Sequence, residues 1–553
     1  MQIRMSVASE AVEIVRARFA SEQIDVEDIE ARTYPDEVVV VVRVNEDDFH
    51  RAALTGNLLD GILGSEGLDA FVTVRSVKGQ TVGPVGTVKE GVHDPRATAL
   101  QQLLRTRAKT SASQPSLSYV QNAAASVVVF GAYRHHLLFG RRGVGKTALM
   151  LEARKRADLD GNDSVWINLQ TYRRESAPRA FLWIVQSTLD QLVAGNRDRP
   201  VRPGLDTEVA TLMERIAALL AAEEATQSAV ERLVPDVHRA LSRHVETWAN
   251  HLFLFLDDFY YLSRMDQPYV LDLLHGCTRD INVWMKVASI QHLTRWFQAS
   301  PPVGLQSGQD ADIINLDVTL QEPERASEFL EQVLGEFCRE VTISRSTAVV
   351  SQAALDRLVF ASGGVPRDYL RLCADAIVKA QGRVGARLAG VQDVNQAAGD
   401  MGILKLRELE EDSSANIGDA EMTLSAFNSL KTFCLDEVNC TYYRVDVRDK
   451  EATPEAYASL VAVTEQRLNH LIDPSVSDAH KVGERYEVYM LDLSQYSGYR
   501  LKQGVRVLDF SKGHLLSRKT RSGEPSRIGV EPRDVTAILR TAPLLELSRL
   551  QAN

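Results

Sequence analysis

The chain has 553 residues, which predicts three or four domains. Hydrophobic residues make up 44% and charged residues 25% of the composition, which is typical of a globular protein with enough apolar side chains for several cores. The formal net charge of −11 excludes a surface that is basic throughout, so any contact with nucleic acid requires a local basic patch.

The sequence predicts neither a signal peptide nor a membrane span. The first residues lack an uninterrupted apolar segment, and no run approaches the roughly 20 apolar residues that cross a bilayer. The five cysteines lie far apart without a C-x-x-C pair, which favours reduced thiols in the cytosol. His135 and His136 are adjacent in an expected strand, so they cannot both face one metal. We therefore expect a cytoplasmic protein without a membrane partner or a transition metal.

Residues 1–80 predict a small α+β module. Helical spacing of apolar residues covers residues 6–20, and the β-branched run over residues 38–44 predicts a buried strand. A second helix is expected over residues 47–63 and a second strand over residues 69–77. Two interpretations stay open: a module that binds a protein partner or another copy of the chain, or a structural support for the next domain.

Residues 81–118 predict a linker that contains one helix. The stretch over residues 77–94 is rich in glycine and valine, which is typical of a linker. A helix is expected over residues 97–108, followed by a stretch rich in serine, threonine and lysine. The next domain is expected to begin near Tyr119.

The sequence GRRGVGKT, residues 140–147, follows a short apolar run and opens a helical one. This is the context that a G-x-x-x-x-G-K-[ST] phosphate loop requires. Its glycines let backbone N–H groups surround phosphate oxygens, and the helix start adds a positive dipole end. Lys146 can reach the β- and γ-phosphates, and Thr147 can hold Mg²⁺. The predicted nucleotide-binding residues are Gly140, Arg141, Arg142, Gly143, Val144, Gly145, Lys146, Thr147 and Ala148.

A second apolar strand, residues 252–256, ends in Asp257 and Asp258. Strand and helix patterns lie between it and the phosphate loop, as in a parallel sheet with crossover helices. In such a sheet the carboxyl end of this strand lies beside Thr147. We predict that Asp257 holds Mg²⁺ through water and that Asp258 orients or deprotonates the attacking water.

A third strand, residues 283–290, ends near polar side chains that can approach the γ-phosphate or the attacking water. Ser289 and Gln291 are the candidates. Arg295 follows one turn later and is a candidate catalytic arginine finger, which reaches the nucleotide of a neighbouring subunit. The alternative is a solvated arginine, which is the usual state of such side chains.

The last core strand is expected over residues 313–320, and helical runs form a predicted lid over residues 321–400. Two of these helices meet at the sequence SGGVPRDYL. Gly363 and Gly364 can end one helix, and Pro366 suits the first turn of the next. Arg367 then lies near a helix start, where it can point back at the nucleotide. The alternative is an ordinary turn between two helices with a solvated arginine.

Taken together, GRRGVGKT, LFLFLDD, the strand that ends at Ile290 and GGVPRDYL resemble the AAA+ ATPases, in particular the branch of origin-recognition initiators and STAND switch ATPases. The resemblance covers residues 119–400. It implies that ATP and Mg²⁺ bind between an α/β core and a helical lid, which change conformation on hydrolysis. It also implies phosphate-loop roles for Lys146 and Thr147, a Mg²⁺ carboxylate at Asp257 and a sensor-2 arginine at Arg367.

The chain departs from this family at Asp258, where typical members carry glutamate. The shorter side chain predicts slow hydrolysis. Since an Asp-Asp pair is common among switch ATPases, the resemblance implies a slow timer rather than a processive motor.

Residues 401–553 predict helices followed by a β element. Amphipathic helices are expected over residues 421–437 and within residues 454–472, and a strand is expected over residues 485–496. Helices followed by a β element resemble a winged helix, which is the usual C-terminal partner of the initiator branch. This resemblance rests on the pattern alone.

A basic strip lies at the C-terminal end of a chain that is acidic overall. Such a strip is what binding to a phosphate backbone of duplex DNA needs. The alternative is a solvated, flexible tail. The strip comprises Arg500, Lys502, Arg506, Lys512, Arg518, Lys519, Arg521 and Arg527, with Tyr496 and Tyr499 at its edge.

The predicted fold is an α/β P-loop ATPase core over residues 119–320, with a helical lid, a small N-terminal α+β domain and a C-terminal winged-helix-like domain. The predicted function is slow, Mg²⁺-dependent ATP hydrolysis that drives a conformational or assembly switch. One interpretation places the switch in a DNA-associated process, such as replication, repair, mobile-element transfer or anti-phage defence. The other is STAND-type signalling through protein partners without DNA.

Overall fold

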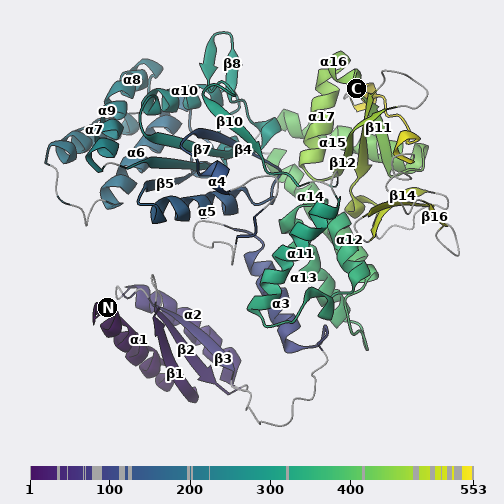
Figure 1. The fold of residues 1–553 in the computed structure, drawn as a ribbon, viewed down its shortest axis with the longest axis horizontal. Helices are drawn as coiled ribbons and strands as arrows, with labels where there is room; N and C mark the ends of the chain where they lie inside the picture. The colour runs from purple at the N-terminus through teal and green to yellow at the C-terminus, as the bar shows by residue number, and fades with distance from the viewer. Residues whose placement is uncertain are drawn as a thin grey trace. The chain divides into compact units, whose positions relative to one another are not determined.

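A computed structural model of the chain forms two compact units, Met1–Lys89 and Glu90–Asn553, which are described separately (Figure 1). Within the described residues, no helix is both long enough and apolar enough to cross a membrane. The described residues are 2–33, 38–45, 48–65, 68, 70–76, 90–110, 119–121, 127–195, 200, 203–222, 225–248, 250–318, 320, 323–413, 417–477, 485–497, 505–511, 514–519, 526–528 and 538–550.

The first unit is an α+β module, as the sequence predicts. Its three strands pair in the order β1-β2-β3, antiparallel and then parallel. Alternate valines of β2, such as Val40 and Val42, are fully buried against two helices. Strand β1 was not predicted from the sequence, since its acidic residues obscure the apolar alternation. The elements are α1 (Gln2–Ser21), β1 (Val26–Thr33), β2 (Val38–Val44), α2 (Phe49–Ser65) and β3 (Ala70–Ser76).

Five parallel strands form the central sheet of the second unit, in the order β10-β4-β7-β6-β5. Every residue of β4 and β6 is buried, which explains why both strands read as continuous apolar runs. The strands are β4 (His135–Phe139), β5 (Asp163–Asn168), β6 (Leu252–Asp257), β7 (Val283–Ser289) and β10 (Ala311–Asn315).

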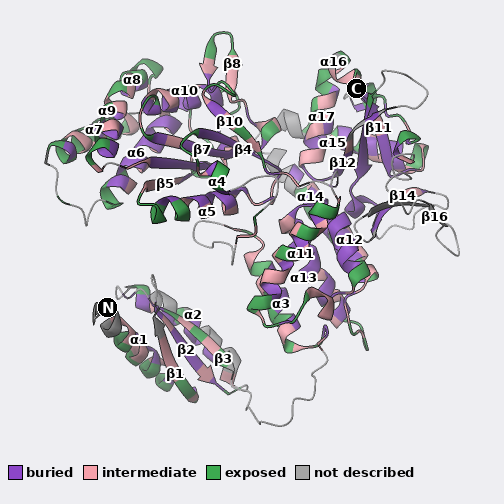
Figure 2. Ribbon diagram, viewed as in Figure 1, coloured by how far each residue is buried: buried purple, intermediate pink, exposed green. Residues whose placement is uncertain are grey.

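Helices cover both faces of this sheet, and the strands alternate between two apolar cores (Figure 2). In β6, Leu254 and Leu256 pack with α6, α9 and α10, while Phe253 and Phe255 pack with α5. The sheet is therefore an α/β core, as predicted. The helices are α4 (Val127–Phe130), α5 (Lys146–Leu159), α6 (Ala177–Gly195), α7 (Pro203–Ala221), α8 (Gln227–Glu231), α9 (Val234–Trp248) and α10 (Gln267–Thr278).

The sequence predicted the last core strand with the wrong bounds and did not predict a short hairpin. The last strand begins earlier than expected and ends at Asn315, since its hydrogen bonds follow the five residues of β4. A short antiparallel hairpin, β8 (Phe297–Ala299) with β9 (Pro302–Gly304), lies between β7 and β10 and was not predicted. Strands of three residues carry no periodicity that a sequence can reveal.

Helices α11, α12, α13 and α14 follow the core, where the sequence predicts helical runs, and α3 joins them. α3 lies in the expected linker region, yet Leu100 and Leu104 belong to the same apolar core as the following helices. Residues 77–89 of the linker lie outside the described residues. α14 runs through residue 400, where a domain boundary was expected. The lid helices are α3 (Pro95–Arg107), α11 (Pro323–Glu340), α12 (Gln352–Ser362), α13 (Pro366–Gln381) and α14 (Val391–Ser413).

The C-terminal domain interleaves helices with an antiparallel sheet in the order β11-β13-β12. The helix expected within residues 454–472 ends at Glu465, and the apolar residues after it enter β12 instead. Strands β14, β15 and β16 form a second antiparallel sheet. The elements are α15 (Ile417–Thr432), β11 (Tyr442–Asp446), α16 (Asp449–Ala452), α17 (Pro454–Glu465), β12 (Asn469–Ser477), β13 (Arg485–Leu491), β14 (Arg506–Ser511), β15 (His514–Lys519) and β16 (Ser526–Ile528).

One continuous apolar core joins the lid to the C-terminal domain. It includes Leu358 of α12 and Ile377 of α13 together with Phe427 of α15 and Val488 of β13, all fully buried or nearly so. The strands of the central parallel sheet belong to other clusters. Packing therefore ties the C-terminal domain to the lid rather than to the sheet.

Candidate nucleotide-binding site

The predicted phosphate loop connects the carboxyl end of β4 to the start of α5. Gly145 precedes the helix with a φ of +103°, and Gly143 has a φ of +85°. Both angles lie in the left-handed region that glycine adopts without strain. The glycines of the motif thus produce the tight turn that the sequence predicts.

Lys146 is the first residue of α5 and is 7% exposed. Its Nζ donates hydrogen bonds to the carbonyl oxygens of Gly140 at 2.7 Å and Arg141 at 3.2 Å. Burial lowers the pKa of Lys146 to about 8, which Asp258 and Asp257 partly oppose. The ammonium group is therefore held inside the loop, where a phosphate group would supply the compensating negative charge.

Thr147 and Asp257 are brought together from positions 110 residues apart. The Thr147 hydroxyl donates to Asp257 Oδ2 at 3.0 Å, because β6 ends beside the start of α5. Burial and the neighbouring Asp258 raise the pKa of Asp257 to about 7. A hydroxyl and a carboxylate suit Mg²⁺, which takes few protein oxygens and completes its shell with water and phosphate. These two residues would hold the ion.

Asp258 follows β6 in a left-handed conformation, with a φ of +57°. Its backbone N–H donates to Asp257 Oδ1 at 3.0 Å. The next residue but one, Tyr260, lies under the guanidinium of Arg142, with 5.3 Å between Arg142 Cζ and the ring centroid. The two carboxylates therefore follow the strand at the edge of the sheet where the phosphate loop lies.

The lid contacts the phosphate loop directly at the start of α13. The Arg367 backbone N–H donates to the Gly143 carbonyl at 3.2 Å. A Cβ atom at Gly143 would lie only 2.7 Å from Arg367 Cβ. The structure thus places the backbone of Arg367 against the loop, and contact of its side chain with the nucleotide stays a prediction.

Comparison with solved structures finds similar chains at low sequence identity. The ORC1 protein of Aeropyrum pernix in complex with DNA is 14% identical, with 72% of this chain and 89% of that chain covered and a TM-score of 0.33. RuvB of Thermotoga maritima is 14% identical, with 59% of this chain and 77% of that chain covered and a TM-score of 0.27. The Drosophila ORC bound to DNA is 12% identical, with 72% of this chain and 92% of that chain covered and a TM-score of 0.28. No protein-family model and no curated protein matches the chain.

Since these TM-scores are low, the geometry of the core itself decides its fold. A phosphate loop leaves a five-stranded parallel sheet, a neighbouring strand brings a carboxylate to the loop's threonine, and a helical lid begins on the loop. The core is an α/β P-loop fold with a helical lid. The predicted α/β core is thereby confirmed, and the structure brings together Lys146, Thr147, Asp257, Asp258 and Arg367.

The residues after β7 occupy different environments in this α/β core. Ser289 is 1% exposed, and its hydroxyl lies 2.5 Å from Thr294 Oγ1. Gln291 is exposed. The backbone N–H of Arg295 donates to Gln267 Oε1 at 2.7 Å, while its guanidinium reaches Met265 Sδ at 3.7 Å. The roles of these three residues stay predictions.

Two polar residues of the site region make contacts that were not predicted from the sequence: His292 was not a candidate site residue, and Arg141 was predicted only as a nucleotide-binding residue. His292, which follows β7, contacts Glu465 of α17, and the guanidiniums of Arg264 and Arg142 add to the effect of burial in lowering the pKa of His292 to about 3. Arg141 is 3% exposed and contacts the lid. The repeated arginine in GRRGVGKT was the only signal available, since nothing in a sequence shows which side of the loop an arginine faces.

The predicted basic strip is only partly described. Arg500, Lys502, Lys512 and Arg521 lie outside the described residues. The backbones of Arg518 and Lys519 lie in β15, and that of Arg527 lies in β16.

Proposed function

We propose that this chain binds ATP with Mg²⁺ and hydrolyses it slowly, and that the lid and C-terminal domain change position with the bound nucleotide. The Thr147–Asp257 pair carries the proposal, because a hydroxyl and a carboxylate meet beside a phosphate loop. Lys146 would neutralise the β- and γ-phosphates, and the loop's N–H groups would bind their oxygens. Mg²⁺ would neutralise charge on the β- and γ-phosphate oxygens.

In this proposal Asp258 orients or deprotonates the attacking water, and Arg367 contacts the phosphates from the lid. Asp258 follows directly on the Mg²⁺ carboxylate, and Arg367 touches the loop at Gly143. The left-handed backbone of Asp258 fits a short side chain, since residues other than glycine, asparagine and aspartate are strained there. Because the side chain of Asp258 is shorter than the glutamate of typical AAA+ members, we expect slow hydrolysis and therefore a switch that resets slowly.

Substitution of Lys146 by alanine tests the proposal. We expect Lys146→Ala to abolish ATP turnover and to weaken binding of a fluorescent ATP analogue, because the phosphates lose their buried cation. Lys155→Ala is the matched control, since this lysine lies on the exposed side of the same helix. Normal hydrolysis by Lys146→Ala would show that the chain does not use this loop for catalysis.

A DNA-associated role is the first candidate for the use of this ATPase. The alternation of helices and strands in the C-terminal domain, with β13 between β11 and β12, supports the winged-helix prediction. The basic strip in β15 and β16 would add phosphate contacts. Binding through it would depend strongly on salt, because each phosphate contact releases counterions.

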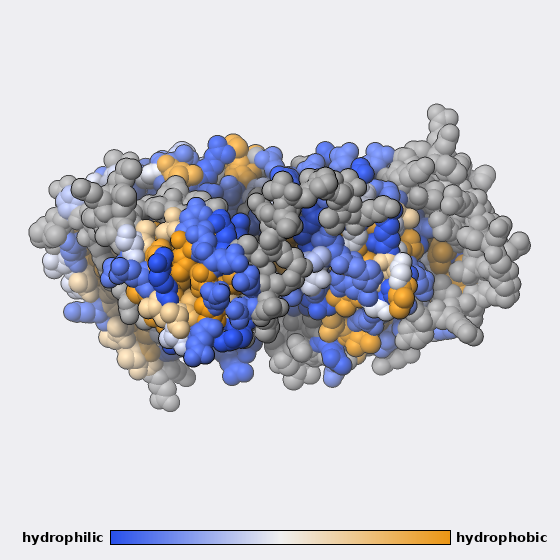
Figure 3. Space-filling view, turned by 90° about the horizontal axis from the view of Figure 1, so that it is seen from below, coloured by the Kyte–Doolittle hydropathy of each residue, from blue (hydrophilic) through white to orange (hydrophobic). Residues whose placement is uncertain are grey.

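Signalling through protein partners is the second candidate, and one observation favours it. The helix α17, PEAYASLVAVTE, carries Glu455 and Glu465 and no lysine or arginine. An acidic helix repels a DNA backbone. The N-terminal unit offers a partner surface, since Leu58 and Phe71 are large apolar residues that are 62% and 49% exposed. Figure 3 shows that apolar patches interrupt the hydrophilic surface on one face of the molecule.

ATP turnover with and without duplex DNA, at low and moderate salt, separates the two candidates. If the first is right, DNA raises turnover, salt removes the effect, and joint neutralisation of Arg518, Lys519 and Arg521 abolishes it. Joint neutralisation of Lys155, Arg173 and Arg174, which are exposed on the ATPase core, is the control with the same charge change. Turnover that is indifferent to DNA supports protein-partner signalling.

A further inference from the structure

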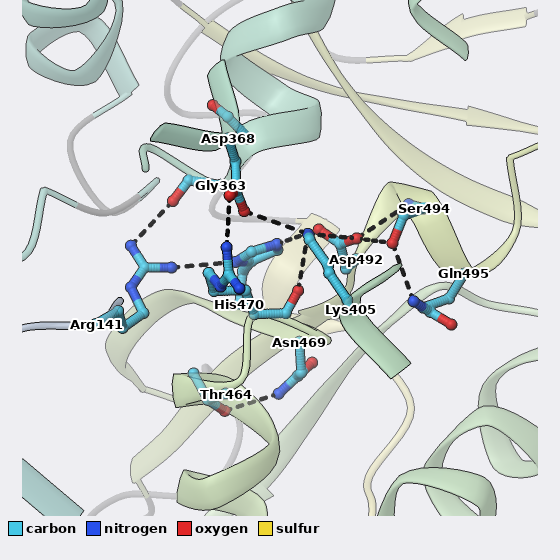
Figure 4. Close-up of polar contacts among 12 residues, drawn as sticks. Arg141, Gly363, Asp368, Lys405, Thr464, Asn469, His470, Asp492, Ser494 and Gln495 are labelled. Carbon is cyan, nitrogen blue, oxygen red and sulfur yellow. Dashed lines mark hydrogen bonds and ion pairs between the residues drawn. The ribbon is translucent and has the colours of Figure 1, made fainter. Parts of the chain in front are cut away.

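Arg141 belongs to the phosphate loop, but its guanidinium is directed at the lid and the C-terminal domain (Figure 4). The Nε donates to Asp317 Oδ1 at 3.1 Å, and one terminal nitrogen donates to the carbonyls of Val318 at 3.1 Å and Gly363 at 3.0 Å. The other terminal nitrogen lies 3.4 Å from His470 Nδ1. These contacts are made with the segment after β10, with the end of α12 and with β12.

The state of His470 is fixed by its second partner. Its Nε2 lies 2.6 Å from Asp492 Oδ2 in a fully buried pair. Burial lowers the pKa of His470, while Lys405 and the His470 ring help to hold the pKa of Asp492 below its usual range. A neutral imidazole that donates from Nε2 to the carboxylate presents an unprotonated Nδ1 to Arg141. The Arg141–His470 contact therefore has a donor and an acceptor in the required places.

Behind His470 lies a charge-balanced buried cluster that joins the lid to the C-terminal domain. Lys405 of α14 lies 3.0 Å from Asp492, and Arg467 pairs with Asp368 of α13. All four side chains are at most 2% exposed. Each buried charge in this cluster has an oppositely charged partner, so the contact between the two domains leaves no uncompensated charge.

Glycines of the lid allow the C-terminal domain to approach closely. A Cβ atom at Gly363 would lie 2.1 Å from His470 Cε1. Cβ atoms at Gly399 and Gly402 would lie 2.9 Å and 2.6 Å from the carbonyl oxygens of Ser497 and Ser494. With the shared apolar core, these contacts make the lid and the C-terminal domain one packed body.

This body touches the ATPase core on a second side of the nucleotide site. Glu465, the last residue of α17, contacts His292 after β7. The Arg141 contact lies at the phosphate loop and the His292 contact at the neighbouring strand. The two contacts therefore hold the C-terminal domain at two segments of the core, the phosphate loop and the residues after β7.

We propose that Arg141 is a positioning residue that couples the phosphate loop to the lid and the C-terminal domain through His470. The coupling rests on the proposed ATP binding and supplies its route to the C-terminal domain. Arg141 fixes the carbonyl that Lys146 contacts, so a change in the seating of His470 changes the loop that receives the phosphates. Since coupling between sites is reciprocal, nucleotide in the loop changes how firmly the C-terminal domain is seated.

A double-mutant cycle measured in ATP-analogue affinity tests this route in the full-length chain. Arg141→Met removes the donor, and His470→Gln removes the Nδ1 acceptor while its amide can still donate to Asp492. We expect each single variant to raise the dissociation constant about fivefold or more, which is the lower range of such couplings. The double variant should bind no more weakly than Arg141→Met alone, because both changes break one contact.

Two further variants act as controls for this cycle. His470→Asn keeps an acceptor near the place of Nδ1 and should bind ATP more tightly than His470→Gln. Arg134→Met removes an arginine that also pairs with an aspartate, Asp312 at 2.6 Å, but lies exposed at the amino end of β4, and it should leave the affinity unchanged. If Arg141→Met does not fold, Arg141→Lys replaces it, since lysine keeps the charge but not the fork of donors.

Hydrogen exchange of the backbone amides in β12 provides a second measurement of the coupling. In the wild type, ATP or ADP should change the exchange of backbone amides around His470, and in Arg141→Met it should not. The coupling is overturned if the losses of affinity in the two single variants add up in the double variant and if amide exchange in β12 is the same with and without nucleotide. That result would leave the ATPase proposal intact. A wild-type chain that binds no nucleotide overturns the proposed function itself, and the coupling with it.

Discussion

The backbone N–H of Arg367 donates to the carbonyl of Gly143, so the lid begins on the phosphate loop. Gly143 has a φ of +85°, and a Cβ atom there would lie 2.7 Å from Arg367 Cβ. We expect Gly143→Ala to weaken ATP binding by at least tenfold, because the methyl group pushes the lid off the loop. The measurement is a titration with a fluorescent ATP analogue.

Gly161→Ala separates this steric effect from backbone strain. Gly161 also has a positive φ, +77°, but no atom lies within 4 Å of a Cβ built there. Its substitution should cost about 1 kcal/mol of unfolding free energy through the left-handed backbone, while ATP affinity stays at the wild-type value. Equal losses of affinity in both variants would show that contact with Arg367 is not the cause.

Removal of the Asp257 charge should abolish the effect of Mg²⁺ on ATP binding. Asp257→Asn keeps an oxygen that can accept from Thr147, but a neutral amide attracts the cation less than a carboxylate. In the wild type, replacement of Mg²⁺ by EDTA should weaken ATP binding by about tenfold or more. In Asp257→Asn the affinities with Mg²⁺ and with EDTA should be equal, and a preserved difference would place the ion elsewhere.

Asp258→Asn should separate binding from turnover. Asparagine tolerates the left-handed φ of +57°, so the backbone after β6 is kept. The amide cannot take a proton from water, and loss of a general base costs about 10²- to 10⁴-fold in rate. We expect ATP affinity within twofold of the wild type and turnover reduced by at least a hundredfold. Normal turnover removes Asp258 from the mechanism.

The sequence predicted the parts of the site that lie within one short segment. The glycines of GRRGVGKT predict the tight turn of the loop. The run before Asp257 is apolar because both faces of β6 are buried. These local signals also predicted that Asp257 lies beside Thr147, since the carboxyl ends of parallel strands share one edge of the sheet.

Contacts between distant segments could not be predicted in the same way. His470 lies 329 residues from Arg141, and no periodicity marks a histidine that packs on a lid glycine. The helix expected to continue past Glu465 ends there because Leu468 and Ile472 are needed in the shared core of the lid and C-terminal domain. Local spacing is compatible with either structure, and tertiary packing decides between them.

Acid should destabilise the ATPase core through two histidines of β4. His135 Nδ1 accepts from the Met285 backbone N–H at 2.9 Å, and His136 Nδ1 lies 2.7 Å from Lys286 Nζ. Burial lowers the pKa of His135 to about 4 and of His136 to about 3. In the unfolded chain both have pKa values of about 6.5, so below that pH the unfolded state binds more protons. The unfolding free energy therefore falls as the pH drops from about 6.5 towards 4, by about 1.4 kcal/mol per pH unit for each histidine.

His135→Asn tests this assignment, because its amide oxygen can accept near the place of Nδ1 and does not titrate. All five tryptophans lie in residues 166–296, so tryptophan fluorescence during urea unfolding at pH 5, 6 and 7 reports the core alone. The variant should lose less stability between pH 7 and pH 5 than the wild type, by about 2 kcal/mol. His238→Asn, in α9 of the same core, is the control and should keep the wild-type slope. If His135→Asn also keeps that slope, protonation of His135 does not drive acid unfolding.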